Sequence, residues 1–334
     1  MLNRLHNRRT VLRLAAVATA LAATAMLTVT ALAEEMEIAV IPKLIGIPYF
    51  ASTGVGAAAA GEELGIKITY NGPTDASTEG QINIVNQAIR RGVDAIAIAP
   101  LDTAALAPSL KRAQKAGIPV VTWDTDADVA SRAAFVTPVS YAAMSAQLVE
   151  SLARDGVTEG PVVQLIAAAT SENMIEYQRL IKAYMAEHYP DMEVVQVLAG
   201  DDDAVKSKAI TTSYLQGNPD TKAIIVTSAA MTPAIEAVKD VGLEGKVIVG
   251  GIGLPSVNGE QTKAGEISRF FLWNPEDLGY ASVYLAKAAI EGKIEGAKTV
   301  NLGKLGNVEV GDDNVLIMAP PFEFNAENVD QFNF

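Results

Sequence analysis

The feature that most constrains this chain is a repeated alternation between short apolar runs and longer stretches with helical patterning. In the first part of the sequence the apolar runs are residues 36–41, 66–70, 95–99 and 119–122, and the helical stretches between them are residues 54–64, 77–91 and 103–115. Strands that are apolar on both faces and connected by helices form parallel sheets with helices on both sides. The first part of the chain is therefore expected to fold as an α/β domain.

The same alternation begins again after Pro138. Its apolar runs are residues 161–167, 193–198, 223–227 and 246–250, accompanied by helical stretches at 141–154, 174–187, 204–215 and 232–241, and followed by a strand at 267–272, a helix at 278–290 and a β-rich tail at 300–317. The predicted fold class is α/β, with two doubly wound parallel-sheet lobes whose boundary lies near Pro138.

Residues 1–33 have the pattern of an export signal. Arg4, Arg8, Arg9 and Arg13 precede an apolar run at 14–30, which ends in Ala31-Leu32-Ala33. A basic region, a short apolar core and small residues at the exit predict a signal peptide that is cleaved after about Ala33. The alternative is a retained membrane anchor, but the core is short and rich in Ala and Thr. The paired arginines also resemble a twin-arginine signal, which leaves the export route open. The mature protein is expected in the periplasm.

Charge and composition exclude several classes of function. The segment 1–33 carries four arginines and no acidic residue, so the formal net charge of −13 becomes −17 without it. A chain this acidic repels nucleic acid and anionic lipid surfaces. The chain has no cysteine, and after residue 33 it has only His188, which argues against a Ser-His-Asp triad and a histidine or thiolate metal site. Small molecules and other proteins are the expected partners.

No cofactor or metal is expected. Gly54, Gly56 and Gly61 follow the first strand and enter a helix, but their spacing differs from the dinucleotide fingerprint and indicates close helix packing instead. The acidic runs 201–203 and 311–314 lack the spacing and the closing glutamate of a calcium loop. They predict a helix N-cap and a turn.

Charged and aromatic side chains gather at the ends of two predicted strands in the first lobe. In open parallel sheets, ligands bind beyond the carboxyl ends of the strands. Lys43 follows the first strand and Asp124 follows the fourth, so both are expected at one crevice. Tyr49, Phe50 and Trp123 lie near them in the sequence and add flat apolar surfaces. Aromatic faces combined with charged hydrogen-bonding groups are typical of sugar sites.

The second lobe offers equivalent groups at its own strand ends. Asn173, Ser228 and the backbone amide of Ala229 follow two of its strands, and Asn274 follows the strand at 267–272. The first three groups are expected to contact a ligand from the second lobe, and Asn274 from the junction of the lobes.

Several short motifs of this chain occur together in one known family. They are IPKL at 41–44, GPT at 72–74, QINIVN at 81–86, GVDAI at 92–96, TWDT at 122–125 and NAENVDQF at 325–332. With the export signal and two α/β domains, the sequence resembles the type I periplasmic sugar-binding proteins of ABC importers. Within them it is similar to the branch that contains autoinducer-2-binding and rhamnose-binding proteins. The resemblance covers nearly all of the chain after residue 33.

The resemblance implies how the two lobes are connected. They are expected to be joined by a three-strand hinge near Pro138, Asn274 and Val300. The expected N-terminal lobe is residues 34–138 plus 275–299, and the expected C-terminal lobe is residues 139–274 plus 300–334.

The resemblance implies roles for individual positions. The lysine and aspartate that contact the ligand in autoinducer-2 receptors match Lys43 and Asp124. Where those receptors have Asp-Gln, this chain has Asn173-Met174, and where they have Pro-Asp-Ala it has Thr-Ser-Ala at 227–229. The segments closer to the rhamnose-binding members are 253–255, 273–280, 303–306 and 310–312. A rhamnose-like deoxy sugar is therefore expected first and autoinducer-2 second.

The resemblance also implies a mode of action. By this resemblance, the protein is expected to be a monomeric receptor, not an enzyme, that delivers a sugar to an ABC permease in the inner membrane. Presentation of the ligand to a chemoreceptor is compatible with this role. One competing hypothesis is a periplasmic sugar-modifying enzyme with Asp124 and Asp126 as acid and base, although two carboxylates at i and i+2 do not by themselves make a catalytic pair. A transcription regulator with this core would need a basic helix-turn-helix, and this chain begins with an export signal instead.

Overall fold

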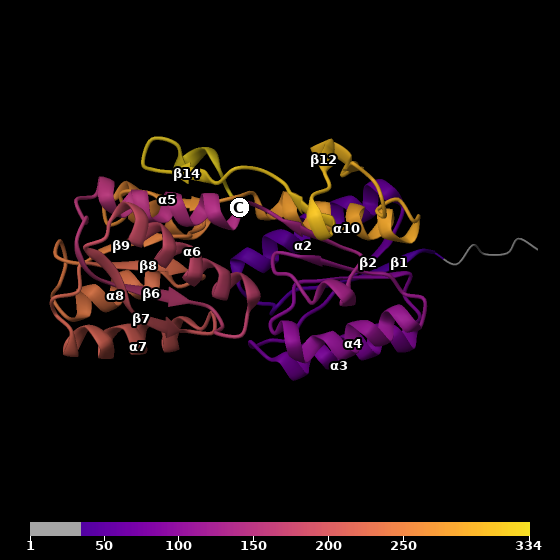
Figure 1. Ribbon diagram of the computed structural model, residues 1–334, viewed down its shortest axis with the longest axis horizontal. Coiled ribbons are helices and arrows are strands. Elements are labelled where there is room, and N and C mark those ends of the chain that lie inside the picture. Colours follow the sequence, from indigo (N-terminus) through magenta and orange to yellow (C-terminus); the bar gives the residue numbers. More distant parts are fainter. Residues whose placement is uncertain (1–34) are drawn as a thin grey trace, which may run out of the picture. The chain divides into compact units, whose positions relative to one another are not determined.

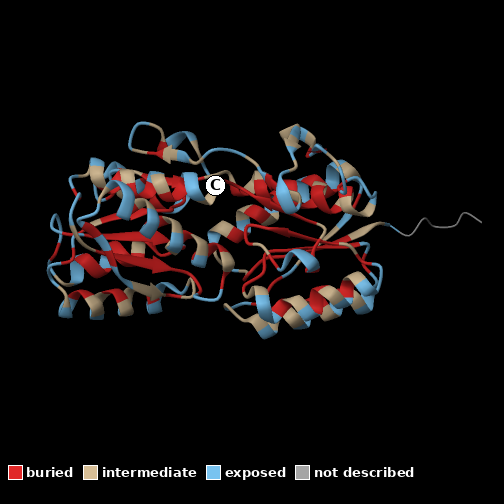
Figure 2. Ribbon diagram, in the orientation of Figure 1, coloured by how far each residue is buried: buried red, intermediate tan, exposed pale blue. Residues whose placement is uncertain are grey.

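Two parallel β-sheets organise the chain (Figure 1). The computed structural model describes residues 35–334, so the predicted signal peptide at 1–33 lies outside the described residues. Residues 37–334 form one compact unit, which contains two lobes, each built around one of the sheets. Most strands are buried because helices cover the sheets (Figure 2). The predicted α/β class with two parallel-sheet lobes is confirmed.

The sheet of the first lobe has six parallel strands. In spatial order they are β13 (Val315–Ile317), β5 (Ala134–Thr137), β4 (Val120–Trp123), β3 (Ala95–Ile98), β1 (Glu37–Ile41) and β2 (Lys67–Tyr70). Because all six strands run in the same direction, their carboxyl ends meet at one edge of the sheet. Lys43 and Asp124 follow β1 and β4 at that edge.

Four helices cover this sheet. Helices α2 (Pro48–Leu64) and α10 (Pro275–Ile290) pack against each other on one side, and α3 (Thr78–Arg91) and α4 (Thr103–Lys115) pair on the other (Figure 1). The contact between α2 and α10 depends on glycine. A Cβ atom at Gly56 would lie 1.7 Å from the backbone oxygen of Glu276, and one at Gly279 would lie 1.8 Å from that of Thr53. The predicted close helix packing of the glycine-rich segment is confirmed.

The sheet of the second lobe has four parallel strands in the order β7 (Met192–Ala199), β6 (Gly160–Ile166), β8 (Ala223–Thr227) and β9 (Ile248–Gly251). Helix α5 (Tyr141–Arg154) packs on α6 (Glu172–His188), and α7 (Ala204–Gly217) packs on α8 (Met231–Asp240). A short helix that the sequence analysis did not predict, α9 (Pro255–Lys263), follows β9. Strand β10 (Phe270–Leu272) touches this sheet through a bridge between Ile252 and Phe271, and β14 (Phe322–Phe324) pairs antiparallel with β10.

The C-terminal tail is divided between the lobes, which corrects the predicted boundaries. β11 (Thr299–Asn301) and β12 (Asn307–Glu309) form a hairpin, and β13 then joins the first sheet beside β5, so residues 299–317 pack with the first lobe. Only the last residues, including β14, join the second lobe. The third crossing therefore lies near residue 318, not at Val300. It runs beside the first crossing, where the amides of Met318 and Ala319 donate to the carbonyls of Thr137 and Pro138 at 3.1 Å.

Two other element boundaries differ from expectation. Helix α2 begins at Pro48 rather than at residue 54, and α10 begins at Pro275 rather than at 278. In both cases a proline occupies the first helical turn, where its missing N–H is not needed. None of the helices in residues 35–334 combines the length and apolarity that a membrane span requires.

Candidate functional site

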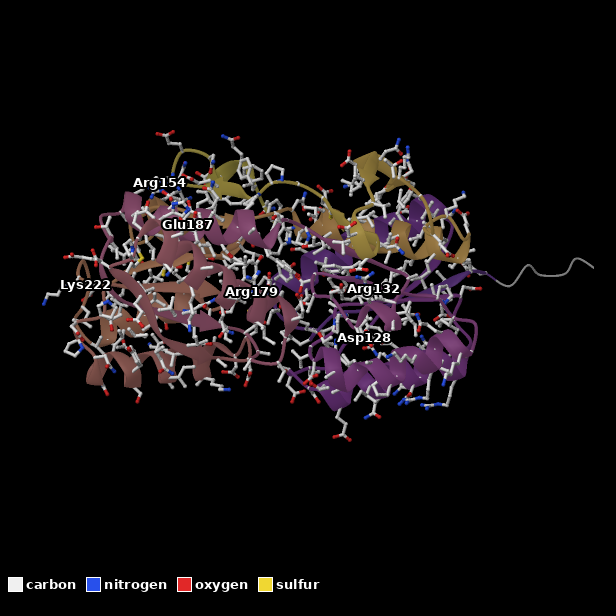
Figure 3. All side chains as sticks on the ribbon, viewed as in Figure 1. Asp128, Arg132, Arg154, Arg179, Glu187 and Lys222 are labelled. Carbon is white, nitrogen blue, oxygen red and sulfur yellow. The ribbon has the colours of Figure 1, made fainter. Side chains whose placement is uncertain are left out.

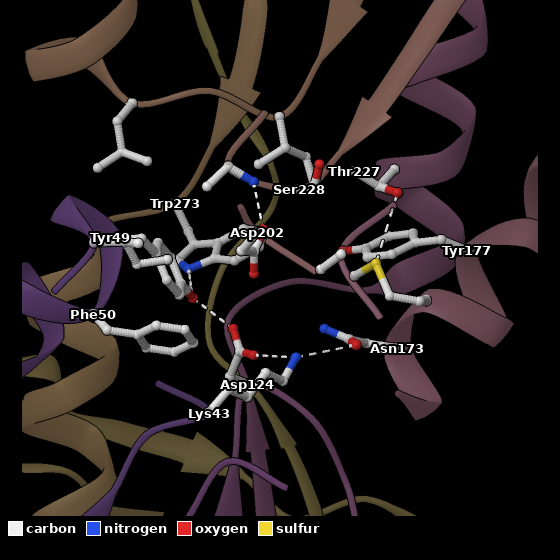
Figure 4. A pocket seen from close by; sticks show the side chains of 16 residues that line it. Lys43, Tyr49, Phe50, Asp124, Asn173, Tyr177, Asp202, Thr227, Ser228 and Trp273 are labelled. Carbon is white, nitrogen blue, oxygen red and sulfur yellow. Dashed lines mark hydrogen bonds and ion pairs between the residues drawn. The ribbon is translucent and has the colours of Figure 1, made fainter. Parts of the chain in front are cut away.

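A cavity lies where the strand ends of the two lobes face each other (Figure 4). Its empty volume is about 520 Å³, counted out to the solvent opening. The lining residues come from both lobes: Lys43, Ile47, Tyr49, Phe50, Asp124, Ala167, Asn173, Met174, Tyr177, Asp202, Thr227, Ser228, Ala229, Ile252, Leu254 and Trp273. Charged, aromatic and aliphatic side chains thus converge on one cavity.

An ion pair between Lys43 and Asp124 is the polar centre of the cavity. The distance from Lys43 Nζ to Asp124 Oδ2 is 3.0 Å, and the two side chains are only 4% and 7% exposed. Such a pair is costly to desolvate and keeps its charges only when further hydrogen bonds satisfy both partners. Tyr49 supplies one of these bonds, because its hydroxyl donates to Asp124 Oδ1 at 2.6 Å. Lys43 donates to Asn173 Oδ1 at 3.3 Å, which links the two lobes.

The network continues from Tyr49 to an indole. Trp273 Nε1 donates to the Tyr49 hydroxyl at 3.1 Å, and the two rings meet edge to face at 6.0 Å. Burial, followed by the charge of Asp124, raises the pKa of Tyr49 well above its ordinary value. The Tyr49 hydroxyl therefore remains protonated and acts as a fixed donor.

The backbone at Asp124 adopts a left-handed conformation. Its φ angle is 64°, and the amide of Thr125 closes a tight turn by donating to the carbonyl of Trp123 at 2.6 Å. Aspartate tolerates this region better than most residues do, but the conformation still costs energy. Strained backbone of this kind is concentrated at functional sites. Here the turn directs the carboxylate of Asp124 toward Lys43.

An aliphatic and aromatic wall from the second lobe faces this polar centre. Met174, Tyr177, Ile252 and Leu254 are all buried and line the cavity, and the Thr227 hydroxyl donates to Met174 Sδ at 3.8 Å. Burial raises the pKa of Tyr177, so its hydroxyl is also neutral. The wall therefore places apolar surface opposite the Lys43–Asp124 pair.

Asp202 is a lining residue that the sequence analysis did not select. The run 201–203 was interpreted as a helix N-cap, and Asp203 does cap α7 by accepting from the amide of Lys206 at 2.7 Å. Asp202 instead turns toward the cavity, where its Oδ1 accepts a hydrogen bond from the Ala229 amide at 2.9 Å. The rule that strand-end residues reach the crevice could have identified it, because Asp202 closely follows β7.

Glu172 lies beside the cavity, at the start of α6. The hydroxyl of Tyr141 lies 3.4 Å from its Oε2, and the same hydroxyl donates to the backbone oxygen of Asp124 at 3.2 Å. Burial, with the charge of Asp126 as the second cause, raises the pKa of Glu172 to about 7. This carboxyl group therefore changes charge near neutral pH, at a contact between the lobes.

Most of the predicted site residues meet at the cavity. Lys43, Tyr49, Phe50, Asp124, Asn173, Ser228 and Ala229 all line it. Trp123 does not: it is 0% exposed and packs edge to face behind Phe50, with ring centroids 6.1 Å apart. Asn274 does not line it either, because its Oδ1 caps α10 by accepting from the amides of Glu276 and Asp277 at 2.9 and 3.3 Å. Both residues therefore support the fold around the cavity instead of lining it.

The carboxylate of Asp126 also has a structural partner. Arg132 contacts it with two nitrogens, at 2.8 Å from Nε to Oδ1 and 2.7 Å from Nη2 to Oδ2. Arg132 lies in the first lobe near Asp128 (Figure 3). A carboxylate held by both oxygens in this way is not placed to act as an acid or base with Asp124. Within residues 35–334, no group of His, Asp and Glu side chains is arranged to hold a metal ion.

Comparison with known proteins assigns the chain to a family by sequence. A sequence profile described as "Periplasmic binding protein domain" matches residues 38–294. The D-ribose/D-allose-binding protein of Pseudomonas aeruginosa is 31% identical over 228 residues, which cover 65% of this chain and 70% of that protein. The D-allose-binding periplasmic protein of Escherichia coli is 27% identical over 262 residues, covering 75% of this chain and 83% of that protein.

Solved structures show the same architecture. An ABC transporter solute-binding protein from Clostridium phytofermentas with bound L-rhamnose has a TM-score of 0.84 at 29% identity, covering 90% of this chain and 98% of that one. LsrB from Clostridium saccharobutylicum in complex with AI-2 has a TM-score of 0.84 at 25% identity, covering 90% of this chain and all of that one. These relatives are solute-binding proteins.

Proposed function

The chain belongs to the periplasmic binding protein domain family, and from that premise we propose that it captures a small sugar for an ABC importer. The observation that carries the proposal is the cavity between the lobes, where a buried Lys43–Asp124 pair faces an apolar wall. Charged groups form stronger hydrogen bonds to sugar hydroxyls than neutral groups do. The rings of Tyr49, Phe50 and Trp273 cover the C–H faces of the sugar.

The favoured ligand is a rhamnose-like 6-deoxy sugar. Its methyl group needs an apolar contact, and Met174, Ile252 and Leu254 provide a buried aliphatic surface in the cavity. The solute-binding protein from C. phytofermentas, 29% identical to this chain, holds L-rhamnose. Autoinducer-2 is the second candidate, because Lys43 and Asp124 match the receptors for that signal. Asn173-Met174 in place of Asp-Gln removes a carboxylate and an amide that such a ligand would use.

The transport cycle follows from this assignment. Residues 1–33 direct export, and the mature protein works in the periplasm as a monomer. Closure of the lobes over the sugar presents a surface that an inner-membrane permease recognises, and a chemoreceptor can use the same surface. The named relatives support a binding function, so no catalytic step is assigned to Asp124.

Isothermal titration calorimetry on the purified full-length protein tests the proposal. The panel is L-rhamnose, D-allose, D-ribose, D-arabinose and autoinducer-2. We expect saturable binding of L-rhamnose with a dissociation constant at or below the micromolar range and weaker binding of the others. Tight binding of autoinducer-2 alone would replace the ligand assignment, and no heat with any member would contradict the sugar-binding function.

A further inference from the structure

Asp202 occupies a position in the cavity that calls for a physical explanation. It follows β7 in a left-handed conformation, with a φ angle of 54°, and its side chain reaches the cavity beside Ser228 and Ala229 (Figure 4). Asp201 has the same backbone conformation, with φ at 57°, but its carboxylate pairs with Lys206 on the surface. The loop therefore directs one carboxylate outward and the next one inward.

The hydrogen bonds of Asp202 are incomplete, in contrast to those of Asp124. Asp124 uses both oxygens, toward Tyr49 on one side and Lys43 on the other. Asp202 has one bond, from the Ala229 amide to Oδ1 at 2.9 Å, and its Oδ2 has no hydrogen-bond partner among residues 35–334. A carboxylate oxygen can accept two hydrogen bonds, so Oδ2 retains its capacity for a ligand.

The charge of Asp202 is also without a direct partner. Lys43 is the positive lining residue, and it already contacts Asp124 and Asn173. Asp202 is half-buried, and partial burial raises the pKa of its carboxyl group above the ordinary value. Stability alone does not explain a charge placed in this way, whereas binding a hydrogen-bond donor does.

We propose that Asp202 determines specificity by accepting a hydrogen bond from a hydroxyl of the bound sugar and by excluding sugar acids from the cavity. This inference rests on the proposed sugar-binding function. Asp202 belongs to the second lobe, opposite Asp124, so a neutral sugar bound between the two carboxylates contacts an acceptor at each end. A ligand carboxylate would add a like charge next to Asp202, which is unfavourable.

The test compares Asp202→Asn with Asp201→Asn as the matched control. Asparagine tolerates the left-handed conformation and can still accept from the Ala229 amide, while its NH₂ group replaces the oxygen that faces the ligand. Calorimetry with the same sugar panel measures binding. We expect Asp202→Asn to weaken the tightest-bound neutral sugar by about ten- to a hundredfold, as for a lost hydrogen bond to a charged group. The control should stay within about twofold of the wild type.

A thermal melt without ligand separates a binding role from a structural one. Because Asp202→Asn removes a disfavoured charge, its unfolding midpoint without sugar should equal or exceed that of the wild type. A lower midpoint together with weaker binding would mean that Asp202 only holds the loop in place, which would overturn the inference.

Competition with D-galacturonate and D-glucuronate measures the exclusion. Neither acid should displace the neutral sugar from the wild type. Both acids should displace it more readily from Asp202→Asn. Displacement from the wild type at concentrations comparable to those of the neutral sugar would overturn the exclusion.

The binding results distinguish failure of the inference from failure of the proposed function. If the wild type binds a neutral sugar and Asp202→Asn binds it equally well, the inference fails while the proposed function stands. If the wild type binds no sugar, the proposed function fails, and the inference fails with it.

Discussion

The two sides of the cavity are built differently. On the first-lobe side, Asp124 is ion-paired with Lys43 and accepts a hydrogen bond from Tyr49, so the three side chains hold one another in place. On the second-lobe side, Met174 and Leu254 offer apolar surface, and the polar groups form isolated pairs, such as Asp202 with the Ala229 amide. A preorganised polar network binds hydroxyl groups in general, because it pays little to orient its groups. A close-fitting apolar wall distinguishes one sugar from another. The comparison suggests that the first lobe provides affinity and the second lobe provides selectivity.

The largest effect is expected from breaking the first-lobe network at Asp124. Asp124→Asn keeps a residue that tolerates the left-handed turn, but it leaves the charge of Lys43 buried without its partner. We expect sugar binding to weaken by more than about a hundredfold, and the free energy of unfolding to fall by about 3 kcal/mol. Calorimetry and urea denaturation measure the two effects.

The control for this variant is Asp128→Asn, which removes an exposed ion pair with Lys111. The side chains of Asp128 and Lys111 are both 44% exposed. The change should therefore lower the free energy of unfolding by less than about 1 kcal/mol and leave sugar binding intact. Equal losses in the two variants would show that the buried pair has no special role.

A double variant separates stability from binding in the first lobe. Lys43→Met combined with Asp124→Asn removes both buried charges, so about 2 kcal/mol of the stability lost in the single variant should return. Binding should stay lost, because both charged contacts to the sugar are gone. Recovery of binding in the double variant would mean that the pair only supports the fold.

On the second-lobe side, Met174→Gln tests selectivity. The wild type should prefer L-rhamnose over L-mannose, which carries a hydroxyl on the sixth carbon in place of hydrogen. Glutamine replaces the apolar contact to the methyl group, so the preference should shrink by about tenfold, with most of the loss on L-rhamnose. The readout is the ratio of the two dissociation constants. An unchanged ratio would show that Met174 does not determine the selectivity between these two sugars.

The smallest effect is expected from the titration of Glu172 between the lobes. Its pKa is raised to about 7 from an ordinary 4.5, so folding favours the protonated form. The contribution of Glu172 to stability is complete below about pH 4.5 and is lost as the pH rises through about 7. Because the side chain is partly exposed, the change should be about 1 kcal/mol.

Melting curves of Glu172→Gln and of the wild type measure this contribution. They are recorded between about pH 5 and about pH 8, a range that includes the pKa of about 7. The variant should gain stability relative to the wild type as the pH rises. Glu176→Gln, which changes a surface partner of Arg179 one turn later, should not. A constant difference between Glu172→Gln and the wild type would show that Glu172 does not titrate in this range.

The sequence predicted the parallel sheets and the meeting of Lys43 and Asp124 at one sheet edge, because both depend on local patterns. Apolar runs separated by helices define parallel strands, and the ends of such strands share one edge. It did not predict that β13 joins the first sheet, because a three-residue strand has too little pattern of its own and pairs according to tertiary context.

The sequence also could not decide which of two adjacent strand-end residues faces the cavity. Neighbouring positions on a strand point to opposite sides, so a shift of one residue exchanges them. At 123–124 the aromatic residue turns into the core and the carboxylate reaches the cavity, whereas at 273–274 the indole lines the cavity and the amide caps a helix. Tyr177 was missed for a related reason, because a helix face toward a cavity has the same pattern as one toward the core.

Tryptophan fluorescence tests the central claim, that a sugar binds in the cavity between the lobes, most directly. The chain has two tryptophans: Trp273 lines the cavity and Trp123 is buried behind Phe50. Titration with L-rhamnose should change the emission of Trp123→Phe, where Trp273 reports alone, and leave the emission of Trp273→Phe nearly constant. A change that persists in Trp273→Phe and disappears in Trp123→Phe would contradict the account, because the sugar would then bind away from this cavity.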